Sequence, residues 1–464
     1  FTCKRLASSF FASVDDCCVS CLYLKQVRTT LKKETHREKM LNGATSQGSD
    51  VVHWFWQDAS FPKRYTPQQI TVSLCDNAPP TGRILMGYAA RVSIVVASVL
   101  LSVECDFRTS PERLQCTNGG ICERPDLSAL KFFLVGDTGG LPIYPYTTYG
   151  QYKVAKAMSK MGEEEQTEFQ ISVGDNVYYT GVKDVFDSRF ESTFETVYQG
   201  EALQKPWYFI AGNHDHFGNI TAQVVYTNHS SRWTFPSLYY KISYKFGEKG
   251  TKVDFIMIDT ILLCGNTRDV EDSGFFEMLF ADVSENPNHP KDPKAAQVQW
   301  EWIKQQLHES TAEYIFVAGH YPVYSISEHG PMSCLIEKLN PLLKKFKVSA
   351  YFAGHDHTLQ HLVVKDSASN GDALVSNDSE STVMHYIISG ASSRSDRSRK
   401  HEGDVPPESS LFSYPTGFNP LSQLGFSNGG FVFVEVSDQS AIFKFFTGKS
   451  ELKYQCSISP RTSH

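Results

Sequence analysis

Potential metal ligands recur in this chain after short apolar runs, each time beside a glycine. The runs and the residues that follow them read KFFLVGD, QISVGDN, WYFIAGNHD, YIFVAGH and AYFAGHDH. Where clustered thiolates are absent, Asp, Asn and His side chains suit iron, zinc or manganese. Crowded carboxylates repel one another and desolvated imidazoles need partners, so a fold with nothing to bind would not gather them. The pattern predicts a metal centre with ligands from Asp137, Asp175, Asn213, His320, His355 and His357.

The elements that position these residues follow from the runs themselves. Continuous apolar runs of about five residues are typical of strands buried on both faces. Helical patterns lie between several of them, over residues 147–162, 184–199 and 295–310. This alternation predicts an α/β fold of βαβ units, in which the carboxyl ends of parallel strands meet at one edge of the sheet. The glycines let the backbone turn sharply there.

Charge is distributed unevenly along the 464 residues. Residues 1–85 carry 11 Lys and Arg against 7 Asp and Glu, so the net charge of −7 leaves about −11 on the remainder. Such an acidic body argues against nucleic acid as a partner. It indicates that an anionic substrate is captured locally, by metal ions or by a few positive groups.

The first 105 residues differ from the rest of the chain. Residues 1–85 show no sustained helical or strand period, whereas residues 86–105 combine a basic start with the apolar stretch VSIVVASVLLSV. This is the pattern of a secretory signal peptide; a transmembrane anchor is the alternative, but roughly 20 apolar residues are needed to span a bilayer. We therefore expect translation from Met86, no stable membrane span, and a secreted or lysosomal protein. The expected regions are 1–85, a non-native leader or a disordered extension; 86–105, the signal peptide; 106–129, a short Cys-containing segment; and 130–464, the main domain.

Sequons and cysteines agree with the secretory route. N-glycosylation sequons begin at Asn219, Asn228 and Asn377. Cysteines in this route are expected to pair. The segment CTNGGIC, from Cys116 to Cys122, resembles one piece of an EGF-like module whose other cysteines are missing. A small local disulfide loop is the preferred interpretation.

The ligand motifs together resemble those of a known family. GDTGG, GDNVYYTG, GNHDH, GHYPVYS and GHDH are similar to the motifs of the purple acid phosphatases, and most of all to the mammalian-type tartrate-resistant acid phosphatases within the calcineurin-like metallophosphoesterases. The resemblance begins near residue 130 and includes RFESTFETVY, SRWTFPSLYY and SISEHGP. It implies that residues 130–464 form the catalytic domain of a metallophosphoesterase, a β-sandwich flanked by helices in α/β/β/α layers.

The first motif departs from that of most calcineurin-like enzymes, which begin with Asp-x-His. Here Asp137 is followed by Thr138 and Gly139, so that histidine is absent. The resemblance implies that Tyr178 replaces it as a phenolate; a packed aromatic residue is the structural alternative. The implied first site is Asp137, Tyr178 and His357 with Asp175 bridging, and the implied second site is Asp175, Asn213, His320 and His355. Hard anionic oxygens suit Fe(III) in the first site, whereas the second suits divalent Fe, Zn or Mn.

The resemblance also implies a reaction. It is hydrolysis of phosphomonoesters, on small molecules or proteins, by a hydroxide held at two metal ions about 3.5–4 Å apart. His214 and His329 are implied to act on the substrate without binding metal, and Asn213 to contact it. His214 would give a proton to the leaving oxygen, with Asp215 orienting it. Without the resemblance, a structural role is the default for His329.

Further expectations follow from the resemblance. Cys264 and Cys334 stand where the family has a disulfide, which leaves Cys116 and Cys122 as a pair and Cys456 unpaired. Segment 266–294 corresponds to an exposed loop that can be cut to raise activity, although its apolar run FFEMLF argues against easy cleavage. We expect a monomer. Two other functions stay open: a phosphodiesterase of the wider superfamily, and a secreted iron-binding protein with little turnover.

Overall fold

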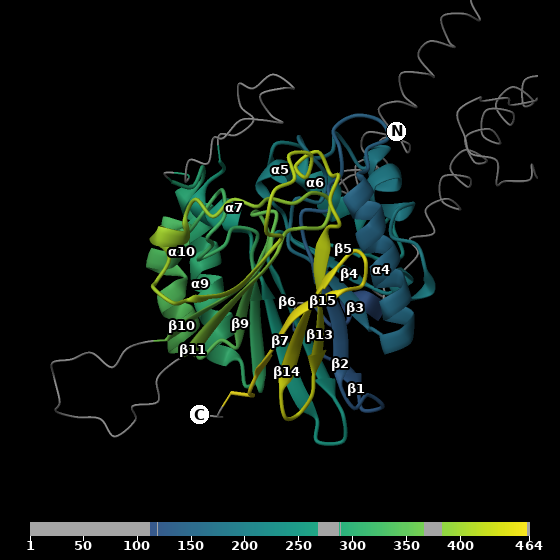
Figure 1. The fold of residues 1–464 in the computed structure, drawn as a ribbon. Coiled ribbons are helices and arrows are strands. Elements are labelled where there is room, and N and C mark those ends of the chain that lie inside the picture. Colours follow the sequence, from purple (N-terminus) through teal and green to yellow (C-terminus); the bar gives the residue numbers. More distant parts are fainter. Residues whose placement is uncertain (1–111, 118, 268–286, 288, 366–382, 462–464) are drawn as a thin grey trace, which may run out of the picture. The chain divides into compact units, whose positions relative to one another are not determined.

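Two β-sheets pack face to face in this chain (Figure 1). The structure is a computed structural model that describes residues 112–117, 119–267, 287, 289–365 and 383–461. Within these residues one sheet has eight strands, in the order β1 (Cys122–Arg124), β6 (Tyr240–Phe246), β7 (Thr251–Met257), β8 (Tyr314–Ala318), β9 (Ala350–Ala353), β11 (Val383–Ser389), β10 (Leu359–Lys365) and β12 (Ser410–Tyr414). The other has seven, in the order β15 (Leu452–Ile458), β14 (Ala441–Thr447), β13 (Gly430–Val436), β2 (Leu130–Val135), β3 (Phe169–Ser172), β4 (Trp207–Phe209) and β5 (Trp233–Thr234).

The core between the two sheets is largely aromatic. Phe132 of β2 contacts Phe255 of β7 with ring centroids 5.3 Å apart, and Phe316 of β8 contacts Phe443 of β14 at 6.0 Å. Next to Phe316 on the same strand, Ile315 belongs to a second buried cluster. The strand is therefore apolar on both faces, which is why its sequence reads as a continuous apolar run.

Helices cover the outer faces of the two sheets (Figure 1). α4 (Tyr149–Glu165) packs against the seven-stranded sheet, and α9 (Pro293–Glu309) packs against the eight-stranded one. The shorter helices are η3 (Glu112–Leu114), η5 (Glu201–Gln204), α5 (Asn213–His216), α6 (Ile220–Tyr226), α7 (Thr260–Cys264), α10 (Ser333–Lys338), α11 (Asn340–Lys345) and η6 (Glu402–Asp404). The chain thus has the expected α/β/β/α layers.

One predicted helix, over residues 184–199, is mostly wrong. Only η4 (Phe190–Glu195) is helical there, as a short π-helix. Before it, Asp184 accepts a hydrogen bond from the Phe186 amide at 2.8 Å, and Asp187 accepts one from the Arg189 amide at 3.0 Å. Such local side-chain bonds offer the backbone an alternative to helical bonding, so the aspartates convert this stretch into turns.

The parallel strands that were expected to carry the ligands are present. β2, β3, β4 and β5 pair in parallel in one sheet. In the other sheet β7, β8, β9 and β11 do the same. The carboxyl ends of each set therefore lie along one edge, as the repeated pattern predicted.

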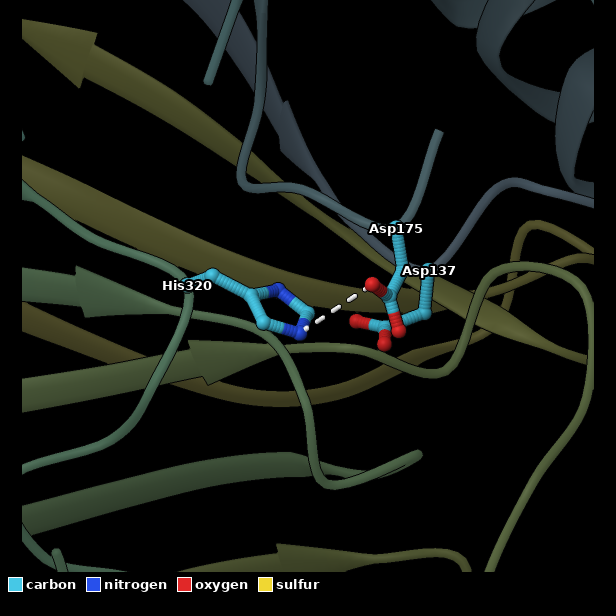
Figure 2. A group of neighbouring side chains, drawn as sticks. All are labelled: Asp137, Asp175 and His320. Carbon is cyan, nitrogen blue, oxygen red and sulfur yellow. Dashed lines mark ion pairs between the residues drawn. The ribbon is translucent and has the colours of Figure 1, made fainter. Parts of the chain in front are cut away.

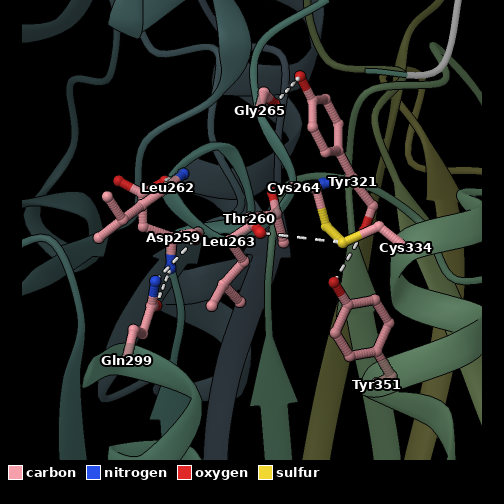
Figure 3. The surroundings of a disulfide bond; sticks show 10 residues. All are labelled: Asp259, Thr260, Leu262, Leu263, Cys264, Gly265, Gln299, Tyr321, Cys334 and Tyr351. Carbon is pink, nitrogen blue, oxygen red and sulfur yellow. Dashed lines mark hydrogen bonds between the residues drawn. A yellow bond between two sulfur atoms is a disulfide. The ribbon is translucent and has the colours of Figure 1, made fainter. Parts of the chain in front are cut away.

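Two disulfides lie within the described residues. Cys116 pairs with Cys122, and Cys264 at the end of α7 pairs with Cys334 of α10 (Figure 3). Tyr321 lies beside the second disulfide, and its hydroxyl donates a hydrogen bond to the Gly265 carbonyl at 3.3 Å. These bonds fix the chain that follows α7. Among the described residues Cys456 is the unpaired cysteine, and it is partly buried.

Replacing both Cys264 and Cys334 with Ala is expected to lower the free energy of unfolding by about 4 kcal/mol, because the disulfide closes a loop of 70 residues. Replacing Cys116 and Cys122, which are 6 residues apart, is expected to cost about 2 kcal/mol. Denaturant unfolding of the two double variants measures the difference. Equal losses would contradict the loop-length account.

Some predictions lie outside the described residues. They concern the leader 1–85, the signal peptide 86–105, the sequon at Asn377 and most of segment 266–294. Asn219 and Asn228 are described and exposed. In the part of the chain that the structure describes, no helix combines the length and the apolar character that crossing a membrane requires.

Candidate metal centre

The predicted ligands converge from the ends of parallel strands. Asp137 follows β2 and Asp175 follows β3, while His320 follows β8 of the other sheet. The ligand atoms of these three buried residues all lie within 4.8 Å of one another, and Figure 2 shows the side chains pointing toward a common centre. Asn213 opens α5 after β4, and His355 and His357 follow β9. The edge where the two sheets meet therefore collects all six.

Unusual backbone conformations aim three of these side chains. Asp137, Asp175 and His355 have φ values of 57°, 53° and 67°, in the left-handed region that residues other than glycine rarely adopt. A neighbouring glycine leaves room for each carboxylate: a Cβ at Gly354 would lie 2.5 Å from Asp137 Oδ2, and one at Gly212 would lie 2.1 Å from Asp175 Oδ1. Gly354 and Gly212 are thus required by the carboxylates that lie beside them.

Gly139 explains why the first motif lacks a histidine. A Cβ at this position would lie 2.7 Å from Cδ2 of the Tyr178 ring and 2.5 Å from the Tyr178 amide nitrogen. The tyrosine therefore occupies space that any larger residue at position 139 would need. Gly139 and Tyr178 are complementary.

Three ligand atoms form the first group. The hydroxyl of the fully buried Tyr178 donates a hydrogen bond to Asp137 Oδ1 at 3.0 Å and lies 2.9 Å from His357 Nε2. His357 Nε2 is 3.7 Å from Asp137 Oδ1. The opposite ring nitrogen, His357 Nδ1, lies 3.1 Å from Gln423 Oε1, which orients the imidazole.

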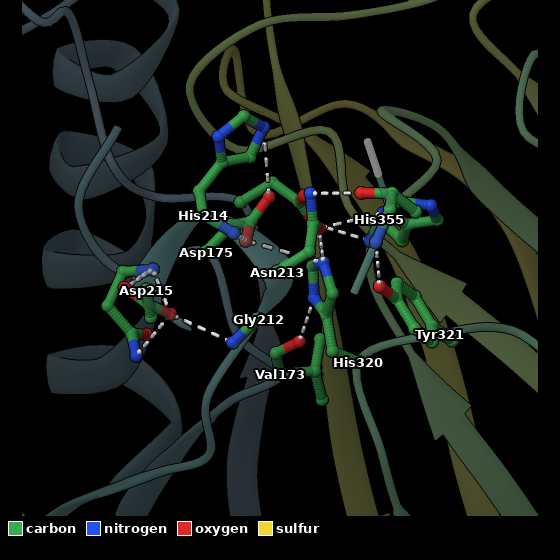
Figure 4. Close-up of polar contacts among 12 residues, drawn as sticks. Val173, Asp175, Gly212, Asn213, His214, Asp215, His320, Tyr321 and His355 are labelled. Carbon is green, nitrogen blue, oxygen red and sulfur yellow. Dashed lines mark hydrogen bonds and ion pairs between the residues drawn. The ribbon is translucent and has the colours of Figure 1, made fainter. Parts of the chain in front are cut away.

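The second group surrounds the side-chain oxygen of Asn213. This Oδ1 lies 2.9 Å from His320 Nε2 and 3.1 Å from His355 Nδ1 (Figure 4). His320 Nε2 also lies 3.4 Å from Asp175 Oδ1. His320 is oriented through its other nitrogen, 2.8 Å from the Val173 carbonyl.

These separations fit metal coordination. Two ligands that are each about 2.1 Å from one ion, at angles of about 90–110°, lie about 3.0–3.4 Å apart. Two groups of converging oxygen and nitrogen atoms, joined through Asp175, therefore suit two ions. The absence of thiolate from both groups favours iron, zinc or manganese.

The electrostatics of the buried groups also favour cations. Burial would raise the pKa of Asp175, but the charges of His320 and His214 lower it. Burial raises the pKa of Asp137 well above its ordinary value, and burial together with the Asp137 charge does the same to the pKa of Tyr178. A phenol in this environment ionises only if a cation compensates for its charge.

The pKa values of the three histidines are shifted in opposite directions. Burial would lower the pKa of His320, yet the Asp175 carboxylate raises it to about 9. Burial lowers the pKa of His355 and His357 well below the ordinary value. Those two imidazoles are neutral, which is the form that binds metal.

His214 lies at the edge of the site. Its backbone amide donates to Asp175 Oδ1 at 3.0 Å, and its ring Nε2 is 3.9 Å from Asp175 Oδ2. The ring packs edge-on against Tyr178, with centroids 4.7 Å apart. The ring is held by the Tyr179 carbonyl, 2.7 Å from Nδ1.

Asp215, which we expected to orient His214, is held by a network of hydrogen bonds. Its carboxylate accepts hydrogen bonds from the amides of Gly212, Asn176 and Val177 and from the Gln223 side chain. It therefore joins the loops after β3 and β4. Burial and the charge of Asp175 raise its pKa to about 6.

His329 also reaches the site. Its ring stacks on that of His355, with centroids 4.1 Å apart and an interplanar angle of 28°. Its backbone amide donates to Asp356 Oδ1 at 2.9 Å. The ring Nδ1 is buried and has no hydrogen-bond partner among the described residues.

Sequence reasoning missed Arg394, a buried residue whose guanidinium lies 4.2 Å from the centroid of the Tyr178 ring. The signal that could have found it is the run MHYIISG, which is apolar, ends in glycine and forms the parallel strand β11. Sequence reasoning also missed Gln423. Its segment carries no such pattern, because it reaches His357 from a loop.

Known proteins with similar sequences were found by comparison. Residues 130–359 match the family model of the calcineurin-like phosphoesterases. The chain is 39% identical to tartrate-resistant acid phosphatase type 5 of Homo sapiens over 328 residues, which cover 70% of this chain and 90% of the relative. It is 29% identical to purple acid phosphatase 7 of Arabidopsis thaliana over 345 residues, 72% of this chain and 88% of the relative. Among solved structures it is similar to GAP50, the anchor in the inner membrane complex of Plasmodium, with a TM-score of 0.55, 25% identity and coverage of 73% of this chain and 90% of that one.

Proposed function

Because the chain belongs to the purple acid phosphatases of the calcineurin-like phosphoesterase family, and is an acid phosphatase, we propose that it hydrolyses phosphomonoesters at a centre of Fe(III) and a divalent ion. The observation that carries the proposal is the pair of ligand groups joined by Asp175, with a buried tyrosine hydroxyl in one of them. Physiological substrates are small-molecule or protein phosphomonoesters.

Asp137, Tyr178, His357 and Asp175 would hold the trivalent ion. Asp137 and Asp175 carry carboxylates, and Tyr178 would become a third anionic oxygen on losing its proton, so this group matches the charge of Fe(III). Asp175, Asn213, His320 and His355 offer one carboxylate, one neutral amide oxygen and two imidazoles, which suits a divalent Fe, Zn or Mn. When bound, the ions supply the nucleophilic hydroxide and neutralise charge on the phosphoryl group.

His214 would then act as the general acid. A carbonyl oxygen accepts hydrogen bonds, so the contact with the Tyr179 carbonyl fixes a proton on His214 Nδ1. The proton available to a leaving oxygen is therefore the one on Nε2 of the doubly protonated ring. The nearby Asp175 carboxylate favours that charged form.

His329 would assist from the side of the second group. Its stacking on His355 places the ring next to a proposed ligand without making it one. Nδ1, which has no hydrogen-bond partner in the described part of the chain, would donate to an oxygen of the substrate.

Turnover of a chromogenic phosphomonoester and of a matched diester, with metal analysis and a visible spectrum of the purified protein, tests the proposal. We expect acid-pH turnover of the monoester, iron in the protein and a purple band. Preference for the diester would support a phosphodiesterase instead. A purple protein without turnover would support an iron-binding role.

Expression from Met86 is expected to give a secreted protein without residues 86–105, glycosylated at one or more of the three sequons. The exposed positions of Asn219 and Asn228 support glycan attachment there. N-terminal sequencing and glycosidase treatment of the secreted material are the measurements. Retention in the membrane, or a secreted chain that still begins at Met86, would contradict the signal-peptide assignment.

A further inference from the structure

A buried arginine joins three of the loops that build the metal centre. Arg394 is 3% exposed and follows β11. It donates a hydrogen bond to the Gly140 carbonyl at 2.7 Å, in the loop after β2, and another to the Tyr179 hydroxyl, in the loop after β3. Its Cζ lies 4.2 Å from the centroid of the Tyr178 ring and 4.8 Å from that of Tyr179. The guanidinium is therefore stacked on the proposed iron ligand.

Among the described residues no carboxylate forms an ion pair with Arg394, although the charge of Asp175 acts on it from a greater distance. Arg232, the other fully buried arginine with a ring contact, pairs with Glu195 at 3.0 Å. The ion pairs among the described residues give Arg394 no carboxylate, and its Nε has no hydrogen-bond partner there. A buried cation without a counter-ion is costly. Two hydrogen bonds and the electron-rich ring of Tyr178, on which the guanidinium lies, partly compensate for this cost.

We propose that Arg394 is a positioning residue that holds the Tyr178 ring from one face, and that its charge, stacked on this ring, sets the colour and reduction potential of the iron. This inference rests on the proposed function, because it takes Tyr178 as the iron ligand. The hydrogen bonds to Gly140 and Tyr179 hold the guanidinium over the ring.

The proposal has two electronic consequences. A positive charge beside the phenolate lowers the energy of the electrons that the ring donates to iron, so removing it lowers the energy of the phenolate-to-iron transition. A positive charge near the iron also disfavours the ferric state relative to the ferrous one, by Coulomb's law. Removing the charge therefore lowers the potential at which the purple band is lost.

The experiment compares iron-loaded wild-type protein with Arg394→Gln, Arg394→Met and Arg394→Lys. Gln keeps a donor for the Gly140 carbonyl, Met keeps bulk, and Lys keeps the charge. We expect the band of the two neutral variants to move to longer wavelength. At a fixed ambient potential, their ratio of ferric to ferrous iron should rise about tenfold or more, from the Coulomb energy of one charge at this range. The Lys variant should lie close to wild type.

Lys153→Met is the matched control, because Lys153 stands 4.2 Å from the centroid of the Tyr149 ring, outside the site. This control should leave the visible absorption band and the reduction potential of the iron unchanged. A neutral Arg394 variant that folds, binds iron and matches wild type in both would overturn the inference, as would a Lys variant that behaves like Gln. If one neutral variant fails to fold, the other is used for the comparison. If both fail, a Lys variant whose band or reduction potential departs from that of wild type would overturn the inference. A wild-type protein that binds iron without colour would instead refute the proposed function, since Tyr178 would not be the ligand.

Discussion

Replacing Tyr178 with Phe is expected to remove the visible colour of the iron-loaded protein and most of its iron. Phenylalanine retains the ring, which is fully buried against Tyr179 and His214, so packing is expected to survive. The oxygen beside Asp137 and His357 is lost, and with it one of the anions that would balance Fe(III). Mutation of a residue that only hydrogen-bonds to a metal ligand typically lowers metal affinity by roughly 10–100-fold. Loss of the ligand itself should lower the affinity for iron by at least this factor.

Metal analysis and a visible spectrum of the Tyr178→Phe protein are the measurements. Tyr240→Phe is the control, because Tyr240 is equally buried and donates a hydrogen bond to the Phe209 carbonyl at 2.7 Å. It should lose some stability and keep its colour. A Tyr178→Phe protein that stays purple with full iron would show that the ligand assignment is wrong.

Replacing His214 with Ala is expected to leave both metals in place and to slow turnover, most strongly for substrates with a poor leaving group. A general acid contributes typically about 10²–10⁴-fold when the leaving oxygen is basic. The kcat of the variant for an alkyl phosphate should therefore fall by about this factor, whereas its kcat for an aryl phosphate should fall far less. Nε2 of the His214 ring lies 3.9 Å from Asp175 Oδ2. Because His214 is not one of the proposed metal ligands, its replacement removes a proton donor and leaves the ligands in place.

Measuring kcat and KM for one alkyl and one aryl phosphate separates two roles of His214. If it mainly bound the phosphate, both substrates would fall together with a raised KM. His216→Gln is the matched control, since His216 lies in the same short helix and pairs with Asp259 at 2.8 Å. An equal kcat loss for both substrates would remove the general-acid role, and unchanged activity would remove His214 from the site.

The strands and the ligands could be predicted because they share one physical cause. A strand buried on both faces must be apolar throughout, so the polar residue that follows it is conspicuous in the sequence. Asp137, Asp175 and His320 were found in this way. Their meeting at one edge follows from parallel pairing and needs no knowledge of side-chain contacts.

Other parts of the site depend on contacts that no local pattern records. Asp215 stands beside His214 in the sequence, yet it binds the amides of Asn176 and Val177 in another loop. Gln423 reaches His357 across 66 residues, and Arg394 reaches Tyr179 across 215. The helix predicted over 184–199 failed because Asp184 and Asp187 bond to nearby amides, an effect that hydrophobic periodicity does not detect.

The left-handed backbone at Asp137, Asp175 and His355 sets stability against activity in this domain. Conformations of this kind cost of order 1–3 kcal/mol each for residues other than glycine. Substituting glycine at any of the three would relax the main chain while removing a side chain of the centre. Selection for thermostability alone would therefore tend to erase the site, whereas selection for phosphatase activity retains its strain. The rest of the two-sheet domain must supply the stability that offsets this strain. Its aromatic core and its second disulfide are therefore needed for catalysis as well as for folding.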